Sequence, residues 1–204
     1  MRITYAILAV LAIAAAGEYI EVGSLDYPVN RPFCGDCNQS LRQQVLVPAD
    51  SMGTAMDIDA VAFLVSEGET VSFDRFTIHM GITGQSSLSE GFESNWMPGT
   101  KTLVYDHEFV TYTSPGVGQW MEIALDTPFW YNGEDNLLVE FGWPGGTEVI
   151  MIWAWVAPDN YTCYAGWEEP QGNLLLESLV LRFSGALELY ADTFAGIKST
   201  LGGY

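Results

Sequence analysis

Basic residues are scarce in this chain. It has 7 Lys and Arg against 26 Asp and Glu, and its formal net charge is −19 over 204 residues. A surface this acidic repels nucleic acid and anionic lipid, so we expect neither as a partner. Hydrophobic residues make up 49% of the chain, and the acidic residues are dispersed among them. The sequence therefore predicts a folded domain with an acidic surface, not a disordered acidic tail.

Histidine is nearly absent, which limits the catalytic chemistry available. Only His79 and His107 occur, and neither accompanies a serine or cysteine in a nucleophile motif such as G-x-S-x-G. We place His79 on a strand, pointing away from the core, and His107 in a turn. Carboxylate pairs are numerous enough to arise by chance, so no glycosidase pair can be singled out. We predict that the protein is not an enzyme and needs no cofactor.

The chain also lacks a hydrophobic run long enough to cross a membrane. Its most apolar stretch, 3–13, follows Arg2 and leads to small residues at 14–16, the order of a secretory signal peptide. A membrane span needs about 20 apolar residues, and this run is shorter. We predict that 1–16 is a signal peptide, that no span remains after its removal, and that the protein is secreted. An uncleaved N-terminal anchor is the alternative.

Cysteine is limited to Cys34, Cys37 and Cys163, which allow one intrachain disulfide and leave one thiol over. The first two have C-x-x-C spacing. A zinc site needs about four ligands, and Pro32 and Asn38 indicate a loop where a redox motif normally opens a helix. We predict a disulfide at Cys34 and Cys37 that holds a loop. Pairing of either with Cys163, free thiols, or a metal or redox role are the alternatives.

Helical periodicity is absent after residue 17, and apolar residues alternate with polar ones instead. Gly, Pro and Asn-Gly turns separate the alternating segments. This pattern predicts an all-β protein, an immunoglobulin-like or jelly-roll β-sandwich of about ten strands. Pro128 is expected to end the strand over 119–125, because proline has no N–H to donate. The expected strands are 18–24, 41–48, 57–65, 73–80, 101–105, 108–113, 119–125, 136–143, 147–156, 174–183 and 186–190.

These segments read as one domain without linker or internal repeat. We divide the chain into an N-terminal strand and arm over 17–30, the β-sandwich over 31–190 and a C-terminal tail over 191–204. Within the predicted hairpin over 119–143, the segment around Trp130 and Tyr131 reads as a turn that covers the core.

Aromatic residues and carboxylates leave ligand binding open. Trp153 and Trp155 share a strand face, which is typical either of a sugar-stacking platform or of a packed core. Structural calcium is possible on so acidic a chain, but no EF-hand loop occurs and no ligand residue is assigned. Asn38 and Asn160 stand in N-x-[ST] sequences and are possible glycosylation sites.

Two stretches carry a family resemblance. The segments "DIDAVAFLVSEGETVSFDRFTIHMGIT" and "WMPGTKTLVYDHEFVTYTSPGVGQWMEIALDTPFWYNGEDNLLVEF" resemble a β-sandwich module that recurs in secreted surface proteins of Bacteroidetes and related bacteria. The resemblance covers roughly residues 20 to 142. It implies a sandwich without enzymatic activity. In its architecture the chain also resembles subunits of pilus-like extracellular fibres, in which an N-terminal strand of one subunit completes the sandwich of another.

The N-terminal strand is the predicted interface. Tyr19, Ile20, Glu21 and Val22 follow the predicted cleavage site, and Ile20 and Val22 would enter apolar pockets while Glu21 stays in water. We predict a secreted subunit of an extracellular filament of identical subunits, assembled by donation of this strand to a neighbouring protomer. Pairing of the strand within its own domain is the alternative arrangement. A monomeric carbohydrate-binding or adhesion module at the cell surface is the alternative function.

Overall fold

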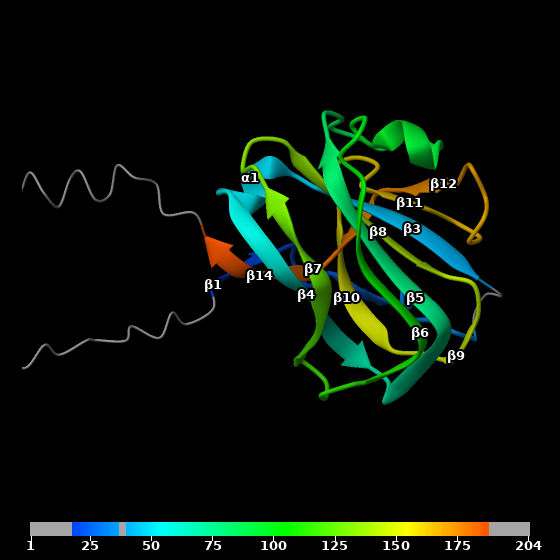
Figure 1. The fold of residues 1–204 in the computed structure, drawn as a ribbon. Helices are drawn as coiled ribbons and strands as arrows, with labels where there is room; N and C mark the ends of the chain where they lie inside the picture. The colour runs from blue at the N-terminus through cyan, green and yellow to red at the C-terminus, as the bar shows by residue number, and fades with distance from the viewer. Residues whose placement is uncertain (1–17, 37–39, 188–204) are drawn as a thin grey trace, which may run out of the picture.

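The computed structural model describes residues 18–36 and 40–187, which form a sandwich of two antiparallel sheets (Figure 1). The all-β prediction is confirmed. The predicted signal peptide, the tail from 191, Cys37 and Asn38 lie outside the described residues.

The first sheet contains seven strands in which β4 is central, with β14 and β7 on its two sides and β10 at its end. The order β1-β14-β4-β10-β13 makes β1 an edge strand, while β2 pairs with β10. Its strands are β1 (Glu18–Val22), β2 (Tyr27–Val29), β4 (Met56–Glu67), β7 (Trp120–Tyr131), β10 (Met151–Val156), β13 (Glu177–Leu179) and β14 (Leu181–Leu187).

The second sheet also has seven strands, in the order β12-β11-β3-β8-β5-β6, with β9 paired to β5. A short helix, α1 (Ala49–Met52), follows β3, and a 3-10 turn, η1 (Phe92–Asn95), lies between β5 and β6. The strands are β3 (Leu41–Val47), β5 (Thr70–Thr83), β6 (Thr102–Thr113), β8 (Asn136–Trp143), β9 (Gly146–Glu148), β11 (Thr162–Ala165) and β12 (Asn173–Leu175).

The core lies between the sheets and is filled by the inward residues of each alternating strand. On β8, Leu137, Val139, Phe141 and Trp143 point into it and are fully buried. Aromatic rings occupy its centre. Phe33 packs edge-on against Phe63 at 4.6 Å between ring centres, and it stacks on Phe76 at 5.7 Å. The same segment supplies a carbonyl at Pro32 that accepts a hydrogen bond from the Trp143 indole.

Several strand boundaries differ from the sequence prediction. The strand β7 does not end at Pro128 but runs to Tyr131. It continues because the β4–β7 register shifts between Ile58 and Ala60, so Pro128 falls in a bulge where no ladder hydrogen bond is required of it. The segments 101–105 and 108–113 join as the single strand β6, which places His107 within a strand and not in a turn.

The remaining differences arise where the chain changes sheets. The predicted strand over 174–183 is three strands, because β12 belongs to the second sheet and β13 and β14 belong to the first. The segment 147–156 is divided between β9 and β10 in the same way. The short strands β2 and β11 were not predicted, because three or four residues are too few to show an alternating pattern. These divisions raise the number of strands in the described residues to fourteen.

The outer face of the second sheet carries a smaller apolar cluster, which the segment 84–100 covers. Trp96 lies against the backbone of β5, where a Cβ at position 81 would be 2.8 Å from its ring, so only glycine fits there. The cluster consists of Leu46, Leu88, Phe92, Trp96, Leu138 and Cys163. It closes one end of an otherwise polar outer face.

Candidate functional site

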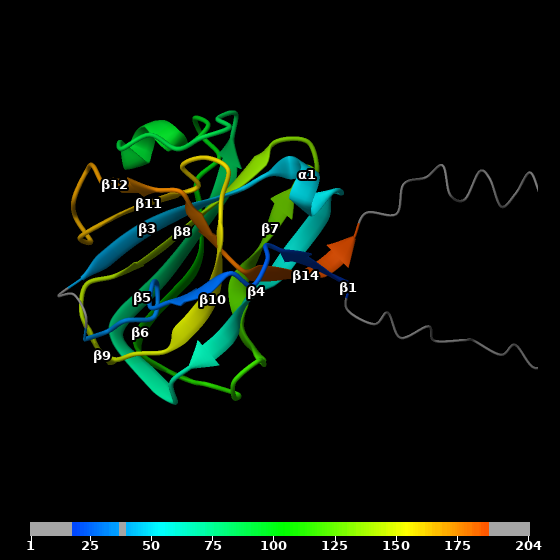
Figure 2. The same cartoon turned by 180° about the vertical axis from the view of Figure 1, so that it is seen from behind.

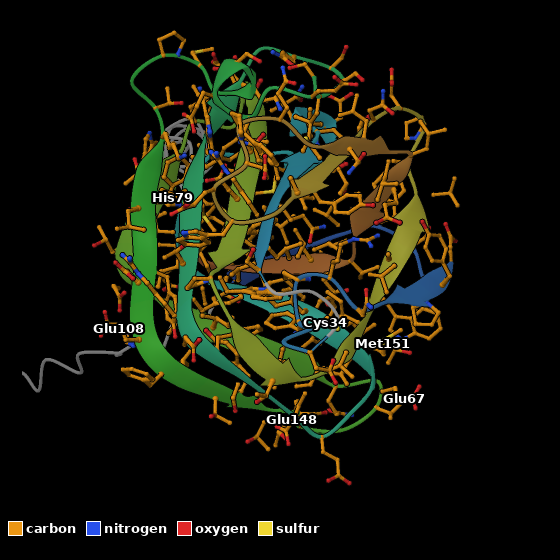
Figure 3. The ribbon with its side chains drawn as sticks, turned by 90° about the vertical axis from the view of Figure 1, so that its right-hand side faces the viewer. Cys34, Glu67, His79, Glu108, Glu148 and Met151 are labelled. Atoms are coloured by element: carbon orange, nitrogen blue, oxygen red, sulfur yellow. The ribbon has the colours of Figure 1, made fainter. Side chains whose placement is uncertain are left out.

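The candidate site lies on this outer face, beside the smaller apolar cluster. Its centre is Glu140 on β8, whose cross-strand neighbours are Gln44 on β3 and His79 on β5. These three residues form one row across the sheet because they occupy matching registers and point away from the core. Figure 3 shows His79 on β5, far along the strand from the end that pairs with Glu148. Together with Arg42, Glu93 and Lys101, these residues are called the Glu140 cluster below.

The carboxylate of Glu140 is only 5% exposed and is held by donors on several sides. Its Oε2 atom accepts hydrogen bonds from Arg42 Nε at 3.0 Å and from Gln44 Nε2 at 2.8 Å. Its Oε1 atom lies 3.1 Å from Lys101 Nζ. A buried carboxylate is stable as an anion only when it is paired in this way. The Glu140 carboxylate is therefore a negative charge held in place by hydrogen-bond donors from neighbouring segments.

Gln44 is itself fixed by the covering segment. Its amide nitrogen also donates to the Phe92 carbonyl at 3.0 Å, and its oxygen accepts from Asn95 Nδ2 at 2.9 Å. Because η1 supplies both partners, the position of the Glu140 carboxylate depends on how the segment 84–100 packs over β3.

Glu93 adds an exposed carboxylate at the mouth of the site. It accepts a hydrogen bond from the Arg42 guanidinium and lies 3.3 Å from Lys101 Nζ. The Arg42 bond holds the pKa of Glu93 below its usual range. Burial opposes the charge on Arg42, but the contacts with Glu140 and Glu93 outweigh it and raise the pKa of that guanidinium. The positive charges of Arg42 and Lys101 therefore balance the negative charges of Glu140 and Glu93.

His79 faces the same carboxylate from β5. Its Nδ1 atom is 3.8 Å from Glu140 Oε1, is buried and has no hydrogen-bond partner. Burial lowers the pKa of His79, and the nearby Glu140 opposes this shift only in part. The imidazole is therefore neutral at pH 7, and its buried Nδ1 atom faces the Glu140 carboxylate.

A hollow of about 360 Å³ and another of about 270 Å³ share the side chain of Trp167 as a wall. The smaller one is lined by the Glu140 cluster except Gln44, together with Thr77 and Gly142. Trp167 lies close over β8, since a Cβ at position 142 would be 2.5 Å from its ring. Glycine at this position thus lets an indole lie directly beside the charged groups.

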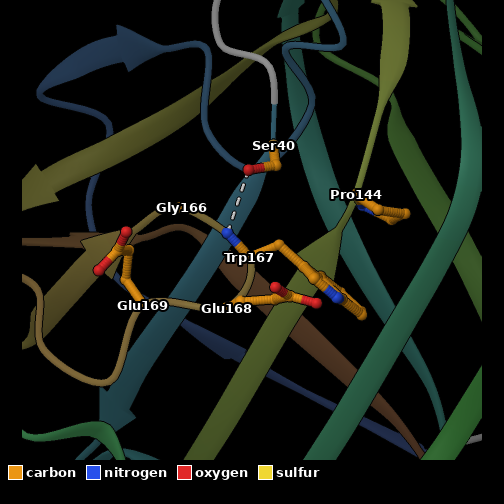
Figure 4. Close-up of a pocket in the computed structure, with 6 residues that line it drawn as sticks. All are labelled: Ser40, Pro144, Gly166, Trp167, Glu168 and Glu169. Atoms are coloured by element: carbon orange, nitrogen blue, oxygen red, sulfur yellow. Dashed lines mark hydrogen bonds between the residues drawn. The ribbon is translucent and has the colours of Figure 1, made fainter.

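The larger hollow lies at the turn that carries Trp167 (Figure 4). The backbone N–H of Trp167 donates to Ser40 Oγ at 3.2 Å, and the Glu169 N–H closes the turn on the Gly166 carbonyl. Glu168 and Glu169 are exposed, and Figure 4 shows Glu168 on the side of the Trp167 ring. An aromatic wall therefore separates a donor-rich hollow from an acidic one.

The predicted donor strand is present as β1, and it pairs with β14 of its own chain (Figure 2). Val22 is 3% exposed, and Ile20 packs partly buried against the core. Glu21 is exposed and forms an ion pair with Arg182 at 2.6 Å. The guanidinium of Arg182 lies over the rings of Tyr19 and Trp120 at 4.4 and 4.2 Å. Donation of β1 to another protomer stays a prediction.

The other predicted residues lie apart from the Glu140 cluster. Cys34 is disulfide-bonded and Cys163 is a free, buried thiol. Cys37, the predicted partner, lies outside the described residues, as does Asn38. Asn160 is half-buried, and its carbonyl accepts a hydrogen bond from the Leu88 N–H.

Trp153 and Trp155 share a face of β10, as predicted, but that face is the outer one. Ile152 and Ala154 point into the core instead. Trp155 packs edge-on against Tyr161 and lies beside Gly23, so segments of the chain itself cover part of this face. The pair does not fill the core, and its role as a sugar-stacking platform stays a prediction.

The Glu140 cluster was not identified from the sequence as a site. Glu140 is the single carboxylate in the apolar strand segment LLVEF. A lone carboxylate in a strand of this kind is the one local feature of the sequence that could have indicated the site. Its partners Gln44 and Arg42 on β3 are 96 and 98 residues away in sequence. The other two, His79 and Lys101, lie on β5 and just before β6. Sequence separation of this size hides the contact, whereas the strand order brings it together.

Among residues 18–36 and 40–187, no group of three or more His, Cys, Asp or Glu side chains is arranged to hold a metal ion. No helix in this part of the chain is long and apolar enough to cross a membrane. A scan against known protein families finds no matching model, and a search of curated proteins finds no match.

Proposed function

We propose that this protein is a secreted structural subunit that assembles into a filament by exchanging β1 between copies. The observation that supports it best is the way β1 is attached. It pairs through one edge only, with β14, and a short connection at 23–25 joins it to the rest of the domain. In this arrangement the strand of one subunit takes the place beside β14 in the next.

The connection at 23–25, called the hinge below, ends at Asp26, which is hydrogen-bonded to β10. The Asp26 N–H donates to the Ala154 carbonyl at 3.1 Å, and Asp26 Oδ2 accepts from the Val156 N–H at 2.8 Å. The hinge residues between this anchor and Val22 are exposed. Short hinges favour exchange of the element they hold, and three extended residues reach about 10 Å. An exchanged β1 would therefore bring two domains into close contact.

Exchange preserves the contacts that β1 makes. The ladder to β14, the burial of Val22 and the ion pair of Glu21 with Arg182 are the same whether the strand comes from one chain or from two. The free-energy difference between the two arrangements is then small, and concentration decides between them. Because each subunit gives β1 to one neighbour and receives another at β14, the contact is head-to-tail and continues as a chain.

Deletion of 18–22 tests this proposal. The deletion variant should be monomeric and less stable, and a synthetic peptide EYIEV should restore its stability by pairing with β14. Full-length protein at high concentration should form fibres in negative-stain electron microscopy. A variant in which the exposed hinge residue Leu25 is replaced, Leu25→Ser, serves as the control and should still assemble. Fibres from the deletion variant, or a full-length protein that stays monomeric, would overturn the proposal.

A further inference from the structure

We infer that the paired hollows on either side of Trp167 bind a neutral, hydroxyl-rich glycan. This inference does not rest on the proposed filament, because the hollows lie on the outer face of the second sheet whereas β1 and β14 belong to the first. Volumes of 270 and 360 Å³ are near the lower end of the range of about 300–1,000 Å³ for small-molecule sites.

The charges of the site select against ionic ligands. Arg42 and Lys101 are each in contact with both Glu140 and Glu93, so the cluster has no surplus charge to attract an anion. The chain as a whole carries −19, which repels anions further. A divalent cation in the smaller hollow would lie beside the two positive side chains Arg42 and Lys101. A neutral ligand avoids both conflicts.

The polar groups instead match hydroxyl groups. A sugar hydroxyl both donates and accepts, and bonds to ionised partners are the stronger ones. Lys101 has three donors, and Glu93 and Glu168 have exposed oxygens that can accept. The imidazole of His79 lines the smaller hollow, although its Nδ1 atom is buried and faces Glu140. These groups offer donors and acceptors together within one small space.

Trp167 supplies the apolar surface that a sugar ring requires. The C–H face of a pyranose is apolar and stacks on an indole, while its hydroxyl edge turns toward polar partners. The Trp167 side chain is half-buried, lines both hollows and lies against β8 at Gly142, and the backbone N–H of Trp167 donates to Ser40 Oγ. Its position is therefore set before a ligand arrives, which lowers the entropy cost of binding.

Native affinity gels that contain soluble β-glucan, xylan or galactomannan test this inference, with gels of alginate and polygalacturonate for the acidic alternative. We expect at least one neutral polymer to retard the protein and neither acidic polymer to do so. Titration calorimetry with oligosaccharides of the retarding polymer then gives the affinity. Trp167→Ala should weaken it at least about tenfold, equivalent to about 1.4 kcal/mol.

Two further variants separate recognition from folding. Trp130→Ala removes an indole that is 50% exposed on β7 and lines neither hollow, and it should leave the affinity unchanged. Glu93→Gln keeps the shape of an exposed side chain. It should weaken glycan binding, and the loss of binding free energy should exceed any loss in the free energy of unfolding. The inference is wrong if no neutral polymer retards the protein, if an acidic polymer is bound more tightly, or if Trp130→Ala and Trp167→Ala lose binding equally.

Discussion

The β1–β14 edge and the Glu140 cluster hold their side chains in different ways. At the edge, β1 pairs with one strand only, through one ladder and one ion pair, and packs Val22 on the core. In the cluster, residues from β3, β5 and the position before β6 contact the buried carboxylate of β8, and η1 holds the β3 residues in place. A contact with one neighbour can be rebuilt with another copy of the chain. A contact among five segments exists only within the folded domain.

The two proposals, assembly through the edge and recognition at the cluster, rest on this difference. The edge is suited to assembly, because breaking and remaking it leaves the rest of the core in place. The cluster is suited to recognition, because Arg42, Gln44 and Lys101 are held in place by their contacts with Glu140. The largest stability loss is therefore expected in the cluster and a smaller one at the edge.

Glu140→Ala is expected to have the largest effect. It leaves the charges of Arg42 and Lys101 without their buried partner and removes an acceptor from Gln44. Breaking a buried pair from one side costs about 3–5 kcal/mol. Urea unfolding followed by fluorescence measures it. Glu122→Ala, at an exposed carboxylate on β7, is the matched control and should change stability by less than about 0.5 kcal/mol. Equal losses of stability for Glu140→Ala and Glu122→Ala would contradict the special role proposed for the Glu140 cluster.

Val22→Ala is expected to have an intermediate effect. Val22 is the deeply buried residue of β1, and burying a valine side chain is worth about 1.5–3 kcal/mol in full. Truncation to alanine should cost part of this amount in urea unfolding. Leu25→Ala, at a hinge residue that is 56% exposed, should be nearly neutral. A Val22→Ala loss that equals the Glu140→Ala loss would mean that β1 is as integral to the domain as the cluster.

A smaller effect is expected from His79 on mild acidification. Burial lowers the pKa of His79 in the folded state below its ordinary value of 6.5, so the unfolded chain binds the proton first. Stability should therefore fall as the pH drops below about 6.5. The carboxyls of Glu93 and Asp126, whose pKa values are also lowered, contribute only at more acidic pH. Between pH 7.5 and 5.5, urea unfolding of His79→Gln should depend less on pH than the parent. An unchanged slope would contradict this.

Local alternation was sufficient to predict the two-sheet fold and most long strands. Met121 and Ile123 are buried, as their alternation predicts. Val22 is buried and Glu21 is exposed to water, also as predicted. The failures occurred where long-range structure overrides a local rule. Pro128 lies in a bulge that exists only because β7 pairs with β4, and His107 continues a strand because its ring bonds Asp126 at 2.8 Å and stacks on Tyr105.

The candidate site was harder to predict for the same reason. Tryptophans at 153 and 155 stood out because they are two residues apart on one strand, whereas Trp167 lies in an ordinary turn. Its importance depends on Gly142 and on the Glu140 cluster, which neighbour it only after β3, β8 and β5 have paired. A site assembled from several strands leaves no fixed spacing in the sequence.

Paired cysteines at positions 19 and 184 test the exchange of β1 most directly. Tyr19 and Ser184 face each other across the β1–β14 ladder, so the double variant Tyr19→Cys, Ser184→Cys should form a disulfide wherever β1 lies. The protein is oxidised at high concentration and run on a non-reducing denaturing gel, with Tyr19→Cys alone as the control. Exchange predicts a ladder of covalent multimers that collapses to monomer on reduction and is absent from the control. A single monomer band with the disulfide formed would show that β1 stays in its own domain and would contradict the filament.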